Sequence, residues 1–64
     1  MKYYIDEKEI TRDEYEDYMM MDAEYSGVPT RLVKRVIKEN ETECLGLGKS
    51  VWKTLFGKTL IIKN

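Results

Sequence analysis

The side chains in this 64-residue chain that best suit acid–base or nucleophilic chemistry are its carboxylates and a single thiol, Cys44. Asp13 and Asp17 are four residues apart, a spacing that brings both carboxylates to one helix face. Paired carboxylates act as a general acid and base when their pKa values are tuned apart. This pair lies among further acids, which favours a solvated acidic surface. There is no histidine, so Ser–His and Cys–His arrangements are excluded and we expect no enzyme.

A second candidate for chemistry is the segment Gly46-Leu47-Gly48-Lys49-Ser50, which has the composition that ends a phosphate-binding loop. The full motif requires a further glycine five residues before Gly48. Glu43 occupies that position, and its negative charge would repel phosphate. We therefore expect no nucleotide triphosphate site. A lone thiol without histidine also cannot form a zinc site, so we expect neither a metal nor a cofactor.

Three other features admit a functional or a structural interpretation. Cys44 falls on the apolar stripe of a predicted helix, which favours a small core residue over a reactive thiol. Asp22 lies on the apolar side of another predicted helix, and we expect it to stay at the solvent edge near the helix end. Met19-Met20-Met21 has two equally good interpretations. The methionines form an adaptable binding surface, or they surround a helix and only some of them reach the core.

The elements that position these residues begin with a short β-prone strand from Lys2 to Ile5 and a polar turn over residues 6–8. Thr11 and Glu14 have the spacing of a capping box, which predicts a helix over residues 12–25. Ile10 precedes the cap and is expected to pack against the first helical turn. One helix face carries residues at helical spacing, namely Tyr15, Tyr18, Met19, Asp22 and Tyr25. Gly27 suits the left-handed C-cap.

Pro29 separates this helix from a second one, predicted over residues 30–46. Its apolar stripe has alternating spacings of four and three and consists of Val33, Ile37, Asn40, Cys44 and Leu47. Residues 39–43 are polar, so an end at Asn40 and an end at Gly46 both remain open.

Residues 51–63 are predicted to form a β-hairpin with strands over 51–55 and 59–63 and a turn at Phe56-Gly57-Lys58. Both faces carry apolar residues, so we expect one face to pack on the helices and the other on a partner or on the N-terminal strand. The chain is thus predicted to be one small α+β domain, residues 1–64, with two helices joined by a tight turn.

Charge is distributed unevenly along the chain. Residues 1–26 have a net charge of −6 and residues 27–64 a net charge of +5. A domain this small has little core, and neither a disulfide nor a metal is expected to support it. A homodimer and a well-packed monomer both fit. No signal-peptide pattern or membrane-spanning run is present, so we expect a cytoplasmic protein without membrane contact.

Two segments resemble the bacterial histone-like HU/IHF family. Residues 27–37, beginning Gly27-Val28-Pro29, are similar to that family's turn and helix, and residues 48–60, with Phe56-Gly57, look like its hairpin. The resemblance implies a dimeric helix–sheet core and a basic surface that binds DNA. The family's long β-arm has no counterpart before Asn64. The opening residues 2–11 resemble short phage and prophage proteins of Gram-positive bacteria, which implies an inhibitor that docks on a host protein.

Two functional hypotheses follow. The preferred one is a non-catalytic protein-interaction module that contacts a host protein through acidic residues of the first helix: Asp13, Glu16, Asp17 and Glu24. The alternative is a small, dimeric, HU-like DNA-binding protein. Its candidate residues are seven bases and one aromatic residue: Arg31, Lys34, Arg35, Lys38, Lys49, Trp52, Lys53 and Lys58.

Overall fold

A computed structural model describes the whole chain, residues 1–64, as two helices and four strands. The α+β class predicted from the sequence is confirmed. The elements are, in order, β1 (Lys2–Ile5), β2 (Lys8–Ile10), α1 (Arg12–Ser26), the 3-10 turn η1 (Thr30–Leu32), α2 (Val33–Leu47), β3 (Lys49–Lys53) and β4 (Thr59–Lys63).

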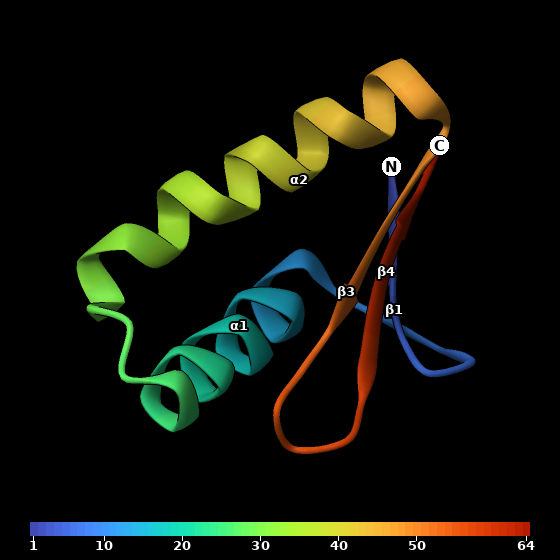
Figure 1. Ribbon diagram of the computed structural model, residues 1–64. Coiled ribbons are helices and arrows are strands. Elements are labelled where there is room, and N and C mark those ends of the chain that lie inside the picture. Colours follow the sequence, from blue (N-terminus) through green and yellow to red (C-terminus); the bar gives the residue numbers. More distant parts are fainter.

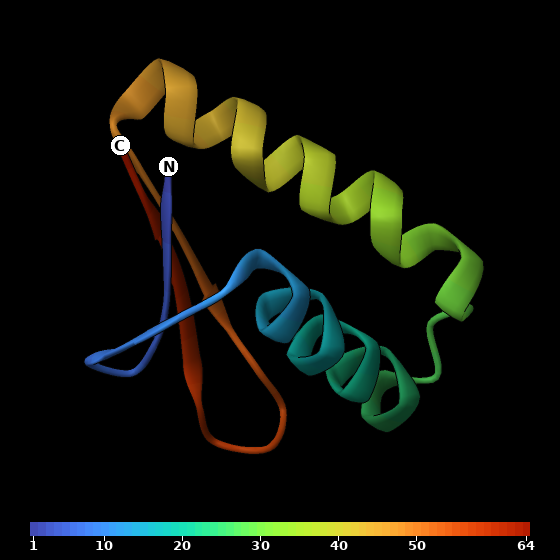
Figure 2. The ribbon, with the colours of Figure 1, turned by 180° about the vertical axis from the view of Figure 1, so that it is seen from behind.

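The four strands form one antiparallel sheet in the order β2-β1-β4-β3. The first and last strands of the chain are therefore neighbours in the centre of the sheet, with Tyr3 opposite Ile62. Both helices lie on the same side of the sheet, and the chain termini lie near the end of α2 (Figure 1). The view from behind shows the same two-layer arrangement (Figure 2). One face of the sheet is consequently covered and the other has no helix over it.

Strand β2 corrects the prediction of a polar turn that leads directly into the first helix. Asp6, with φ of 53°, and Glu7 connect β1 to β2, and Ile5 lies opposite Lys8. Ile10 lies in β2 opposite Tyr3 and is buried, rather than acting only as a contact at the helix start. Three residues are too few to show the alternating pattern that predicts a strand. This segment becomes a strand because it pairs with β1.

Helix α1 begins as predicted. Thr11 Oγ1 accepts a hydrogen bond from the Glu14 amide at 3.1 Å, and the Thr11 amide donates to Glu14 Oε1 at 2.9 Å. This capping box satisfies two amides that lack helical partners and lowers the pKa of Glu14. The helix ends one residue later than predicted, at Ser26, and Gly27 caps it with φ of 74°.

Helix α2 continues to Leu47, so the polar stretch at residues 39–43 does not end it. Its buried residues are Val33, Ile37, Asn40 and Cys44, which confirms the predicted stripe up to Cys44. Leu47, by contrast, is 78% exposed. Gly48 ends the helix in the left-handed conformation, with φ of 85° and its amide bonded to the Cys44 carbonyl.

The first of the two C-terminal strands is displaced from its predicted position, whereas β4 has the predicted bounds, Thr59–Lys63. Strand β3 occupies 49–53 rather than 51–55, and Thr54 begins the connection to β4. The Thr54 hydroxyl donates to the Lys58 carbonyl at 2.8 Å and accepts from the Lys58 amide at 3.0 Å. This side-chain link closes the loop early, which leaves Leu55 outside the strand and 67% exposed.

The core lies between the covered sheet face and the two helices. Cys44 is fully buried, and its thiol donates to the Ile62 carbonyl at 3.5 Å, which confirms it as a core residue. The buried Asn40 amide donates to the Tyr15 hydroxyl at 3.1 Å, which satisfies both polar groups. The buried apolar set is Tyr3, Ile5, Ile10, Tyr15, Met19, Ala23, Val33, Ile37, Cys44, Leu60 and Ile62.

Candidate partner-binding surfaces

Asp22 joins α1 to the β3–β4 segment and is not at the solvent edge, where the sequence placed it. Its side chain accepts hydrogen bonds from the Trp52 indole N–H at 2.9 Å and from the Leu55 amide at 2.7 Å. Asp22 is only 6% exposed. Buried carboxylates require such donors, and these come from residues thirty or more positions later in the chain.

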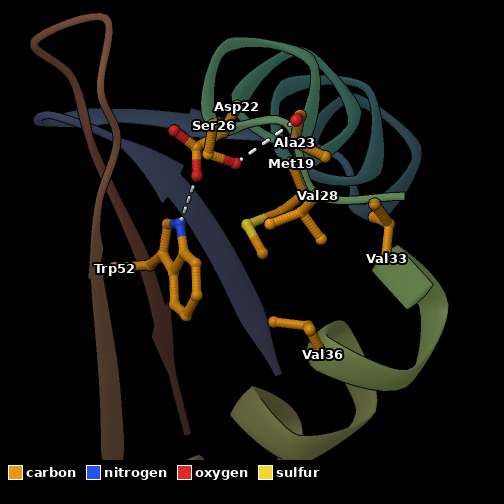
Figure 3. A pocket seen from close by; sticks show the side chains of 8 residues that line it. All are labelled: Met19, Asp22, Ala23, Ser26, Val28, Val33, Val36 and Trp52. Carbon is orange, nitrogen blue, oxygen red and sulfur yellow. Dashed lines mark hydrogen bonds between the residues drawn. The ribbon is translucent and has the colours of Figure 1, made fainter. Parts of the chain in front are cut away.

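A small apolar pocket lies beside this hydrogen bond, between α1, α2 and β3 (Figure 3). Its cavity volume is about 70 Å³, room for a few carbon atoms rather than for a cofactor. Trp52 forms one wall and directs its indole N–H at Asp22 (Figure 3). Trp52 therefore lies on the inner side of the sheet. It is not a freely exposed aromatic residue on which a base could stack.

The predicted acidic residues lie on the side of α1 opposite its buried residues. Asp13, Asp17 and Glu24 are exposed and form no ion pair. Glu16 lies closer to the edge of this face and is 3.7 Å from the Arg12 guanidinium. Three of the four predicted acids thus lie on one surface of α1 and have no ion-pair partner.

An aromatic cluster borders this surface and was not predicted. The Phe56 ring lies between two α1 rings, with centroid distances of 6.3 Å to Tyr18 and 5.8 Å to Tyr25. Tyr25 was expected on the core-facing stripe, yet it is 65% exposed. It belongs to the last turn of α1, where it meets the β3–β4 connection instead of the core.

Exposed apolar side chains extend the cluster. The three consecutive methionines divide, because Met19 is buried, Met20 packs against the core and Met21 is 42% exposed. Helical spacing places Met21 next to Asp17 and Tyr25, four residues away on either side. We call the combined region the aromatic–acidic surface; it consists of Asp17, Tyr18, Met21, Glu24, Tyr25, Leu55 and Phe56. The sequence placed Tyr18 and Tyr25 on the core-facing stripe, so this surface became recognisable only in the tertiary structure.

The predicted basic set does not form one surface. Arg31, Lys34, Arg35 and Lys38 are exposed on η1 and α2, and among them only Arg35 has an ion pair, with Glu39 at 3.9 Å. Lys49 and Lys53 alternate with the inward-facing Ser50 and Trp52, so they project from the opposite sheet face. Lys58 lies in the β3–β4 connection, 3.5 Å from Asp6.

Tyr3, Arg12 and Glu41 form a polar cluster between the sheet and both helices. Arg12 donates to both Glu41 carboxylate oxygens, at 2.9 and 3.3 Å, and the Tyr3 hydroxyl donates to the same carboxylate. The Arg12 hydrogen bond lowers the pKa of Glu41, while burial, followed by the contact with Glu41, raises the pKa of Tyr3 to about 12. Each member is engaged by another, which suits a structural link.

The structure contains no group of three or more cysteine, aspartate or glutamate residues placed to hold a metal ion. Neither helix has the length and apolar character that crossing a lipid bilayer requires. A comparison with protein families, curated proteins and solved structures found no match. The surfaces themselves are therefore the basis for assigning a role.

Proposed function

We propose that this chain is a non-catalytic, cytoplasmic protein-binding module that docks through its aromatic–acidic surface. The observation that supports this role is the cluster of the exposed Tyr25 with the half-buried Tyr18 and Phe56, bordered by the unpaired carboxylates of Asp17 and Glu24. Aromatic side chains dominate the energetics of protein interfaces when they fill partner pockets, and charges at the rim direct the encounter.

The acidic residues also weaken the free helix. Asp13 and Asp17 are like charges at helical i, i+4 spacing, which destabilises a helix by a few tenths of a kcal/mol. Glu24 lies in the last turn, where the helix dipole disfavours an acid, and that turn has no basic residue. A basic partner would remove both penalties, so the charge pattern favours a protein with a positively charged site.

The partner we propose is a host protein whose basic site, bordered by an apolar pocket, receives the tyrosines and Phe56. In this role the chain is a phage-type inhibitor, and a site that ordinarily holds nucleic acid has the required charge. The chain itself needs neither a cofactor nor a reacting group for this role.

Co-purification from host lysate with mass spectrometry tests the role. Tyr25→Ala/Phe56→Ala should abolish capture of the partner, because it removes the central apolar contacts. Asp17→Lys/Glu24→Lys should weaken capture strongly. Glu7→Lys/Glu43→Lys makes the same charge change at two other exposed acids and should leave it intact. If both charge reversals reduce capture equally, the aromatic–acidic surface is not the docking site.

A second candidate function is duplex DNA binding through η1 and α2. Arg31, Lys34 and Lys38 are exposed and unpaired, as phosphate contacts require. The HU-like resemblance suggests that such a protein acts as a homodimer. Fluorescence anisotropy with duplex DNA and sedimentation of the free chain test both points. DNA binding that is unchanged in Arg31→Ala/Arg35→Ala would exclude η1 and α2 as the interface.

A further inference from the structure

The uncovered face of the sheet has a composition unlike that of the covered face. Strand residues alternate between the faces, and Tyr3, Ile5, Leu60 and Ile62 point into the core. Their neighbours in sequence therefore belong to the other face, which has no helix over it (Figures 1 and 2). These outward positions are Lys2, Tyr4, Glu9, Lys49, Val51, Lys53, Thr59, Ile61 and Lys63, which include four lysines and one acid.

Three of the lysines form one row across the sheet. Lys63 of β4 lies directly opposite Lys2 of β1 on one side and Lys49 of β3 on the other. Adjacent strands are about 4.8 Å apart, so the row spans roughly 10 Å. All three are exposed, and none forms an ion pair with a carboxylate. Like charges in directly opposed positions destabilise a sheet, and an anion on this face would remove the repulsion.

The next row along the strands is apolar. Tyr4 lies opposite Ile61, which lies opposite Val51. Val51 is 46% exposed, and the Lys63 ammonium lies 5.3 Å from the centroid of the Tyr4 ring. A flexible lysine, rather than core atoms, thus covers the outer face of that ring. Lys53, at the far end of β3, borders this row with a further positive charge.

We propose that the uncovered sheet face binds single-stranded nucleic acid. Lys2, Lys49, Lys53 and Lys63 neutralise the phosphates, and Tyr4 stacks on a base once the Lys63 side chain moves to a phosphate. Single-strand binders combine basic tracks of this kind with aromatic platforms, because every base has a stacking surface. A duplex keeps its bases inside the helix, and an acidic peptide has none, so neither would use the ring between the lysines.

This surface lies across the sheet from α1, so it is independent of the aromatic–acidic surface. Loss of protein capture after changes at Tyr25 or Phe56 has no bearing on it, and the converse also holds. The chain would thereby present a protein-binding side and a nucleic-acid-binding side at once.

The test is fluorescence anisotropy of the full chain with labelled oligo(dT) of about 12 nucleotides, within the usual single-strand site size. Binding is expected at low salt and should weaken with added salt. Lys49→Gln/Lys63→Gln should reduce the slope of log affinity against log salt by about 1.4, since each lost phosphate contact contributes about 0.7. Tyr4→Leu, which keeps an apolar residue, should weaken binding about tenfold through lost stacking.

Lys8→Gln is the matched control for Lys2→Gln, because each removes one exposed lysine from the sheet and Lys8, opposite Ile5, does not belong to the row. It should leave the oligo(dT) affinity nearly unchanged. Lys2→Gln gives an independent test of the row, and circular dichroism establishes that each variant is folded. The inference is overturned by any of four results: no binding at low salt, equal loss in Lys2→Gln and Lys8→Gln, tighter binding of a duplex, or equally strong competition by polyglutamate.

Discussion

The Trp52 indole N–H donates to the Asp22 carboxylate at 2.9 Å, and this bond connects strand β3 to helix α1. The second carboxylate oxygen accepts the Leu55 amide at 2.7 Å, directly before Phe56. The two bonds therefore hold the β3–β4 connection against α1 at the point where Phe56 meets Tyr25. The aromatic–acidic surface owes its shape to a buried acid at its base.

Asp22→Asn should lower the free energy of unfolding by about 2 kcal/mol, because an amide cannot accept both hydrogen bonds and leaves a donor without a partner. Urea unfolding followed by the fluorescence of Trp52, the only tryptophan, measures this loss. Asp17→Asn, an exposed position on the same helix, should change stability by less than about 0.5 kcal/mol. Equal effects of the two substitutions would contradict the role assigned to Asp22.

Two glycines at the end of α2 should respond in opposite directions to alanine. Gly46 lies within the helix with open space around it, so Gly46→Ala should stabilise the protein by about 0.5–1 kcal/mol. Gly48 has φ of 85°, so Gly48→Ala should destabilise it by about 1–2 kcal/mol despite equally open surroundings. Thermal unfolding of both variants tests this prediction. Midpoint temperatures that shift in the same direction in the two variants would contradict it.

Glu41 should make the protein sensitive to acid. Its hydrogen bonds from Arg12 and Tyr3 lower the pKa of the folded state below the ordinary value of 4.5. A carboxyl whose pKa is lowered by folding stabilises the folded state at pH values above its ordinary pKa. This stabilisation is lost as the pH falls through the pKa of the folded state. At neutral pH, Glu41→Gln should therefore be less stable than the wild type by about 1–2 kcal/mol. The difference measured by urea unfolding should shrink in acid; a constant difference would argue against the ion pair as its source.

Tyr3 should make the stability of the protein decrease at alkaline pH, whereas Glu41 makes it decrease at acidic pH. Its pKa rises from 10.0 to about 12 in the folded state, mainly through burial. A raised pKa gives stability that is complete below pH 10 and is lost as pH rises through 12. Tyr3→Phe should flatten part of this decline when unfolding is followed by circular dichroism. The 295 nm absorbance of the remaining tyrosines serves as the control for global unfolding, and an unaltered decline in the variant would exclude Tyr3.

The helices were predictable because their signals are local. Thr11 and Glu14 define a helix start within four residues, and the α2 stripe repeats over several turns. Strand β2 was missed because its three residues become a strand only through pairing with β1.

The surfaces depend on contacts that are distant in sequence, which is why the candidate sites were only partly predictable. The acids of α1 were found from their spacing, but Phe56 joins Tyr25 only in the folded chain. Likewise, Trp52 was predicted to share a nucleic-acid surface with the lysines. In the structure β3 begins two residues earlier than predicted, and Trp52 lies on its inner side. The lysine row emerges only once β4 is known to lie between β1 and β3.

The central pairing of β1 with β4 has a consequence for synthesis. Lys2 is opposite Lys63, so β1 can pair with its second neighbour only after the ribosome has added β4. Helix α1 can form while the chain emerges, but the sheet that covers its buried side cannot be completed until β4 has been synthesised. Such distant pairings slow folding. Until then, the nascent chain exposes the apolar side of β1, and the sheet is completed in a single late step.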